Sequence, residues 1–266
     1  MGIDECAPAY ASLKIWQPAI DDARAKGHFY VLGADVAYGS SEWKDASVAH
    51  VYRCFGDKIE LVCEYHSTQC NPTQFAWVIA FLAGLYGNTV VNLEVNGPGQ
   101  VVYQELDQLA RIAMSVKTTE NREIGNVMRH IRHYVYNKFN GGSKQGSVRH
   151  WVTTAANKDR MLSAFRDSFT RELVEMPSVE TIEEMKQCVR DGSYIGGGAK
   201  DDKDDRVMAS ALAHIAWMDN LRVQLMAQGV TKKRAVEVER QMNANGKPSV
   251  IGHMLQDFNR SRGIRH

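Results

Sequence analysis

The stretch Phe29-Tyr30-Val31-Leu32-Gly33-Ala34-Asp35-Val36-Ala37-Tyr38-Gly39 decides how this chain can be organised. A short apolar run bounded by glycine and polar residues is typical of a buried strand, so Asp35 is expected at the carboxyl end of a central strand. A carboxylate there costs several kcal/mol unless it is hydrogen-bonded, paired with a cation or bound to a metal. Taken alone, Asp35 also fits a strand-end turn or a helix cap, so its role depends on the rest of the chain.

The segments that follow this strand predict a sheet of mixed direction. Residues 46–55 and 59–65 are rich in β-forming residues and are joined by the Gly56-Asp57 turn, so the first three strands form an antiparallel meander. Asn71-Pro72 opens a helix that ends at Gly87. The apolar run 89–95 is then a strand parallel to its neighbour, because a crossover helix precedes it.

The second half of the chain predicts mostly helices. We expect one further strand in this half, at 133–139. Residues 141–147 are expected to form a flexible loop or a hairpin tip, and residues 196–198 a hinge-like loop. The helix after residue 205 has Met208, Ala211, Leu212 and Ile215 on one face. The expected helices cover residues 100–113, 122–132, 155–173, 179–189 and the segment after 205.

Composition places the chain among ordinary globular proteins. Its 266 residues are 44% hydrophobic and 24% charged, and the net charge of +1 does not indicate a class of partner. The five cysteines contain no Cys-x-x-Cys pair, which fits reduced thiols in a cytosolic compartment. No signal peptide or long apolar span is evident, so we expect a soluble, intracellular protein.

Acidic residues stand at three points that this topology brings together. Asp35 and Glu94 end strands, and Asp204-Asp205 begin the last long helix. Strand ends and helix starts at one edge of an open sheet converge in space. Clustered carboxylates repel one another unless cations compensate them, and two Mg²⁺ or Mn²⁺ ions are suited to do so. A two-ion site of this kind supports phosphodiester hydrolysis, which is nuclease chemistry.

Each acidic residue also has a simpler interpretation. Asp204 and Asp205 could stabilise the unpaired amides of a helix N-terminus. Glu94 could pair with a surface cation. Three further acidic residues are weaker candidates for the site. Asp201 and Asp202 are interpreted as solvated loop charges, and Asp45 as a turn residue or an outer member of the site.

Three motifs in this order resemble a known family. They are Gly-Ala-Asp-Val-Ala-Tyr-Gly around Asp35, Leu-Glu-Val-Asn-Gly-Pro-Gly around Glu94, and Lys-Asp-Asp-Arg-Val-Met-Ala-Ser-Ala-Leu-Ala at 203–213. Together with Trp151-Val152-Thr153-Thr154, they resemble the RNase H-like nuclease domain of tailed-bacteriophage terminase large subunits, over residues 14–218. The resemblance implies an α/β fold: a mixed central sheet, three antiparallel strands followed by parallel strands, and helices on both faces.

The resemblance also implies an activity. That family cuts concatemeric viral double-stranded DNA during genome packaging with two divalent cations, Mg²⁺ or Mn²⁺. Its metal-binding carboxylates carry over onto Asp35, Glu94, Asp204 and Asp205; Asp205 is favoured as a direct ligand, and Asp204 at the second ion or in the outer shell. The implied partners are double-stranded DNA, the terminase ATPase domain, the small terminase subunit and the portal protein, in the cytoplasm of the infected bacterial host and without a membrane.

One departure from the family concerns ATP. The chain contains no Gly-x-x-x-x-Gly-Lys-Ser/Thr phosphate loop, and the glycines at 196–198 with Lys200 have the wrong spacing. We therefore expect the nuclease portion alone, without ATP hydrolysis. The expected organisation is a lead-in or linker at 1–27 with room for one short helix, the nuclease domain at 28–225, and a basic tail at 226–266. From residue 222 onward the chain has nine Lys or Arg and three Asp or Glu.

Cations near the flexible loop are candidates for holding DNA phosphates, although surface Lys and Arg are more often solubilising. His130 and His133 have helical spacing but lack a third ligand for a metal. The alternatives to a terminase nuclease are a junction resolvase or transposase-like nuclease, and a docking module that binds DNA or the portal without cutting. The candidate phosphate contacts are Lys138, Lys144, Arg149, Lys158 and Arg160.

Overall fold

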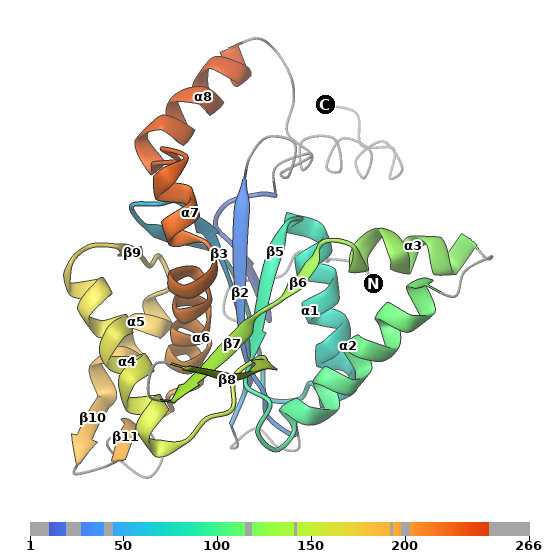
Figure 1. The fold of residues 1–266 in the computed structure, drawn as a ribbon, viewed down its shortest axis with the longest axis vertical. Coiled ribbons are helices and arrows are strands. Elements are labelled where there is room, and N and C mark those ends of the chain that lie inside the picture. Colours follow the sequence, from blue (N-terminus) through green and yellow to red (C-terminus); the bar gives the residue numbers. More distant parts are fainter. Residues whose placement is uncertain are drawn as a thin grey trace.

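The computed structural model describes residues 11–19, 28–39, 45–114, 119–140, 143–191, 194–197 and 203–244. A seven-stranded sheet forms its centre, with the strand order β1-β4-β3-β2-β5-β6 and β9 paired to β4 (Figure 1). The strands of this sheet are β1 Leu13–Ile15, β2 Phe29–Asp35, β3 Ser47–Cys54, β4 Ile59–Ser67, β5 Thr89–Leu93, β6 Ile131–His133 and β9 Val174–Glu175.

Strand directions agree with the expectation from sequence. Strands β2, β3 and β4 pair antiparallel, whereas β5 and β6 join the sheet in parallel. The crossover between β4 and β5 is helix α1, Pro72–Tyr86, which starts with a capping box between Asn71 and Gln74. The meander followed by parallel strands is therefore confirmed, and β2 is paired along both of its edges.

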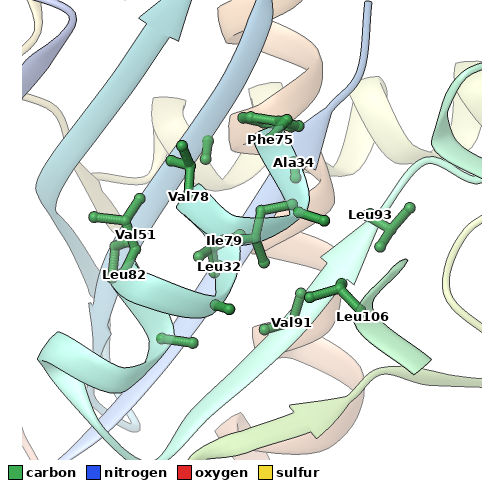
Figure 2. Packing of buried hydrophobic residues seen from close by; sticks show 14 of the residues in the cluster. Leu32, Ala34, Val51, Phe75, Val78, Ile79, Leu82, Val91, Leu93 and Leu106 are labelled. Carbon is green, nitrogen blue, oxygen red and sulfur yellow. The ribbon is translucent and has the colours of Figure 1, made fainter. Parts of the chain in front are cut away.

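Helices cover both faces of the sheet (Figure 1). One face carries α1, α2 (Gly99–Met114) and α3 (Thr119–Met128), and the other carries α6 (Asp205–Asn220), α4 (Ala155–Thr170) and α5 (Val179–Gln187). Figure 2 shows the first of these cores, in which Phe75 and Ile79 of α1 belong to the same buried cluster as Leu32 and Val91 of the sheet. Burial of apolar surface on each face, at about 25 cal/mol per Å², provides the main stabilisation of this layered arrangement.

Helix α6 is buried on all sides and lies directly on β2. A Cβ atom at Gly33 would lie 2.0 Å from the carbonyl oxygen of Ala209 and 2.4 Å from the amide nitrogen of Ala213, so the two backbones meet only because residue 33 is glycine. Asn92 of β5 donates a hydrogen bond of 2.9 Å to the carbonyl of Leu212. These contacts hold the start of α6 over the carboxyl end of β2.

The segment after α3 differs from the sequence-based expectation. The strand expected at 133–139 is divided at Tyr134, where the chain leaves the sheet after β6 and β7 (Val135–Asn140) pairs with β8 (Ser143–Arg149) in a separate hairpin. The Tyr134 hydroxyl donates a 2.7 Å hydrogen bond to Asp219, which anchors the division. Of the two interpretations given for 141–147, the β7–β8 pairing agrees with a hairpin tip, although the strand already begins at Ser143; Gly141 and Gly142 lie outside the described residues.

A second difference concerns the segment around 188–197. The helix expected at 179–189 ends at Gln187, because Cys188–Asp191 form strand β10 and pair with β11, Tyr194–Gly197. Gly196 therefore belongs to a strand instead of a hinge, and Gly198 lies outside the described residues.

Both ends of the described chain contain structure that the sequence did not indicate. Leu13–Ile15 pair antiparallel with β4 as an edge strand. After α6 come α7, Arg222–Ala227, and α8, Lys232–Ala244, in a region with no strong apolar period. The Lys232 amide donates to Asp57 at 3.0 Å, which attaches the start of α8 to the sheet. Among the described helices, none has the length and apolarity needed to cross a membrane.

Candidate active site

A cleft of about 520 Å³ opens at the edge of the sheet where β2 and β5 end. All four acidic residues singled out in the sequence line it, although they come from three separate elements. The lining residues include Asp35, Glu94, Asp204 and Asp205, together with Tyr38, Asp45, Thr153, Lys158 and Lys203.

Asp35 and Glu94 meet because β2 and β5 are adjacent and parallel. The Glu94 amide donates to the carbonyl of Ala34 at 3.0 Å, so the two carboxylates leave neighbouring strand ends. One Asp35 oxygen accepts the Val36 amide at 2.9 Å. Burial, followed by the negative charges of Glu94 and the Asp204-Asp205 pair, raises the pKa of Asp35 well above its usual range.

The turn after Glu94 folds tightly against it. A Cβ at Gly99 would lie 1.7 Å from the Glu94 carbonyl oxygen, so only glycine allows α2 to begin there. Asn96 then binds both backbone groups of Thr153, at 2.8 and 2.9 Å. This places the Trp151-Val152-Thr153-Thr154 stretch beside Glu94, where Trp151 forms a parallel bridge with it.

Asp205 begins α6 and is nearly buried. One of its oxygens accepts the Ala46 amide at 2.8 Å, just before β3. Burial raises the pKa of Asp205 to about 7, assisted by the charges of Asp45, Glu184 and Asp204 and opposed by the Ala46 hydrogen bond. Asp204 occupies the N-cap position but makes no side-chain capping bond, so the simple capping interpretation fails for it.

Lys158 supplies a positive charge inside the cleft. Helix α4 starts with a capping box between Thr154 and Asn157, and one turn of helix brings the Lys158 ammonium to within 2.9 Å of an Asp204 oxygen. Burial lowers the pKa of Lys158, but Asp204 outweighs it, with help from Asp35 and Glu94, and the net shift is upward. No ion pair of Glu94 is found among the described residues.

The donor set matches a hard divalent cation, because several carboxylates line one cleft and Asp35 is partly buried among like charges. Within the part of the chain that the structure describes, however, no three His, Cys, Asp or Glu side chains already converge closely enough to hold an ion.

Of the remaining candidates with described side chains, only Asp45 is among the residues that line the cleft. Arg149 is exposed at the end of β8, and the Arg160 guanidinium lies 5.8 Å from the ring centre of Tyr136. Asp45 lines the cleft and pairs with Lys203 at 2.9 Å. His133 bonds to His150 at 2.9 Å. Lys138 and Lys144 belong to β7 and β8, but their side chains, like Asp201 and Asp202, lie outside what the structure describes.

Sequence reasoning missed a buried polar network behind Asp205. Arg206 donates to Glu64 at 3.2 Å and to Glu184 at 2.6 Å. Glu64 lies 3.1 Å from His50, whose other nitrogen lies 2.8 Å from the Ser210 hydroxyl. This Ser-His-Glu order resembles a hydrolase triad, but Ser210 and His50 are completely buried, so no substrate reaches them. The partners are far apart in sequence, and no local pattern could have identified them.

The Asp205 carboxyl predicts a particular pH dependence of stability without metal. Its pKa is about 7 in the folded chain and about 3.9 when unfolded, so the unfolded chain loses the proton first as the pH rises. The stability it contributes below about pH 4 is therefore lost by about pH 7. Melting curves in EDTA should show this fall in the wild type and a smaller one in Asp205→Asn. Glu64, whose pKa is lowered in the folded chain, makes stability rise with pH, but it is present in both proteins and contributes equally to both profiles. Identical profiles would therefore contradict the assignment of the fall to Asp205.

Comparison with known proteins places this geometry in a known fold. No protein-family model matches the sequence, and no curated protein is significantly similar to it. Among solved structures, the large terminase nuclease from thermophilic phage G20c with bound magnesium has a TM-score of 0.53 at 17% identity, covering 77% of this chain and 87% of that one. The same nuclease with bound cobalt has a TM-score of 0.53 at 18% identity and the same coverage. This chain therefore has the RNase H-like fold of the large terminase nucleases, as its sequence motifs predicted.

Proposed function

We propose that this chain is a metal-dependent DNA endonuclease of the terminase type, which cuts concatemeric viral double-stranded DNA during genome packaging. The observation that carries the proposal is the cleft that Asp35, which is partly buried, shares with Glu94 and the Asp204-Asp205 pair. Such a concentration of negative charge is unfavourable for folding unless cations bind to it. The shared fold supports the proposal as an analogy.

Each side chain then has a distinct task. Asp35, Glu94 and Asp205 would hold the cations directly, and Asp204, already paired with Lys158, would act at the second ion or in the outer shell. Two Mg²⁺ or Mn²⁺ ions, when bound, supply an activated water and stabilise the attacking and leaving oxygens. The Ala46 amide holds one Asp205 oxygen, so the other would be the one that binds a cation.

A duplex would reach this cleft over a surface with several cations. Lys158 stands within the cleft, and Arg149 and Arg160 are exposed on β8 and α4, outside its lining. Contacts of this kind provide most of the salt-dependent affinity of nucleases for DNA. We propose that these three residues, with Lys138 and Lys144, hold phosphates.

The wider setting follows from the same analogy. The proposed partners are a terminase ATPase domain, the small terminase subunit and the portal protein, in the cytoplasm of an infected bacterium. Because this sequence has no phosphate loop, ATP hydrolysis would come from the separate ATPase domain. A docking module that never cuts is disfavoured, since clustered carboxylates repel phosphate.

The proposal is tested by incubating the chain with supercoiled plasmid and Mn²⁺ or Mg²⁺, with EDTA in a parallel sample. We expect nicking and linearisation that depend on the metal. A synthetic four-way junction and a matched linear duplex, offered together, separate this activity from that of a resolvase, which would cut only the junction. DNA binding without cleavage at any metal concentration would overturn the proposal in favour of a docking module.

A further inference from the structure

The start of α6 is held from behind by α5. Glu184 contacts residue 206 twice: one carboxylate oxygen accepts the Arg206 amide at 2.9 Å, and the other accepts its guanidinium at 2.6 Å. Both side chains are largely buried, and neither lines the cleft. We call these two contacts between Glu184 and Arg206 the clamp. Arg206 directly follows Asp205, so the clamp holds the residue next to a proposed metal ligand.

This clamp replaces a missing helix cap. The side chain at an N-cap position usually accepts an amide from the second or third residue of its own helix. Asp204 makes no such bond, and the amide of Arg206, the second residue of α6, is bound by Glu184 instead. The Asp204 carboxylate is thereby left to lie in the cleft, 2.9 Å from Lys158.

The clamp itself is firmly anchored. Arg206 also donates to Glu64 at 3.2 Å, and Glu64 accepts hydrogen bonds from Ser178 at 2.7 Å and Thr181 at 3.2 Å. Ser178 is the N-cap of α5. The carboxylate on β4 therefore fixes both the start of α5 and the side chain of Arg206, so α5 and α6 keep one relative position.

We propose that Glu184 is a positioning residue that caps α6 from the neighbouring helix, so that Asp204 and Asp205 both remain available to a divalent cation. This inference rests on the proposed function, because it assumes that the two aspartates bind metal. Glu184 itself would contact neither the metal nor DNA. Partners that orient metal ligands typically change metal affinity by about 10- to 100-fold when they are removed.

The test measures Mn²⁺ binding directly by calorimetry, at about pH 8 so that Asp205 is ionised in every variant. Glu184→Ala removes the cap and the ion pair, whereas Glu184→Gln keeps an amide oxygen that can accept the Arg206 amide. Glu175→Ala is the matched control, since Glu175 pairs with Lys58 and Lys232 at the opposite end of the sheet. Melting curves in EDTA establish that each variant is folded.

We expect Glu184→Ala to weaken Mn²⁺ binding about tenfold or more, Glu184→Gln to lose less, and the control to bind as the wild type does. Cleavage at saturating Mn²⁺ should recover in the Glu184 variants. Equal losses in Glu184→Gln and Glu184→Ala would mean that charge alone matters and would overturn the capping role, as would unchanged binding in both. A wild type that binds no Mn²⁺ would instead overturn the proposed function, and this inference with it.

Discussion

Asp35→Asn is expected to abolish metal-dependent DNA cleavage while making the metal-free protein more stable. The substitution keeps the shape of the side chain but removes a charge that a divalent cation needs as a ligand. Removal of a residue that only orients a metal ligand typically lowers metal affinity or activity by about 10- to 100-fold. Loss of a direct ligand should therefore reduce cleavage by more than about a hundredfold. The plasmid assay measures this loss, at a matched Mn²⁺ concentration.

The gain in stability has an electrostatic cause. The pKa of Asp35 is raised because burial and three nearby carboxylates oppose its charge, so at neutral pH the group favours unfolding. A neutral amide removes that repulsion. A gain of about 1 kcal/mol would raise the melting temperature by roughly 2–4 °C in a protein of this size.

The control for both effects is Asp167→Asn, an exposed aspartate on α4 that lies 3.9 Å from Arg166. It should change neither cleavage nor melting, because exposed ion pairs contribute little. Cleavage retained in Asp35→Asn, or a lower melting temperature than the wild type, would show that Asp35 does not have the role given to it.

Gly33→Ala should have the largest effect on stability. The added methyl carbon would lie 2.0 Å from the Ala209 carbonyl and 2.4 Å from the Ala213 amide, both in the backbone of a buried helix that cannot move aside locally. Overpacking of a core typically costs about 1–3 kcal/mol, and contact with rigid backbone belongs at or above the upper end of that range. Urea unfolding measures the loss. Because α6 carries Asp205, Mn²⁺ binding should weaken too.

Gly125→Ala is the matched control for this substitution. Gly125 lies within α3, and the nearest atom to an added Cβ is the Ala113 carbonyl oxygen at 3.7 Å, an ordinary contact. Alanine should therefore be neutral or stabilise the helix by roughly 0.5–1 kcal/mol. If Gly33→Ala unfolds at the same urea concentration as the wild type, the direct contact between β2 and α6 is not as tight as described.

Some elements could be predicted because their signals are local. The apolar runs of β2 and β5, and the Asn71-Pro72 start of α1, specify strands and a crossover helix within a few residues. The second strand of the β7–β8 hairpin and the edge strand β1 could not be predicted in the same way. Their pairing depends on partners brought from elsewhere, and segments such as Leu13–Ile15 are too short to show a period.

In the candidate site, too, some features follow from local sequence and others only from tertiary packing. The sequence by itself determined that Asp35 and Glu94 end strands and that Asp204-Asp205 start a helix, because hydrophobic runs and their polar boundaries are local properties of the chain. Only the tertiary structure decided which neighbours these carboxylates meet. Lys158 reaches Asp204, and Glu184 caps α6, through the packing of α4 and α5 against α6. Hydrogen bonds and ion pairs between distant residues depend on separations of a few ångströms, and those are set only when the helices pack.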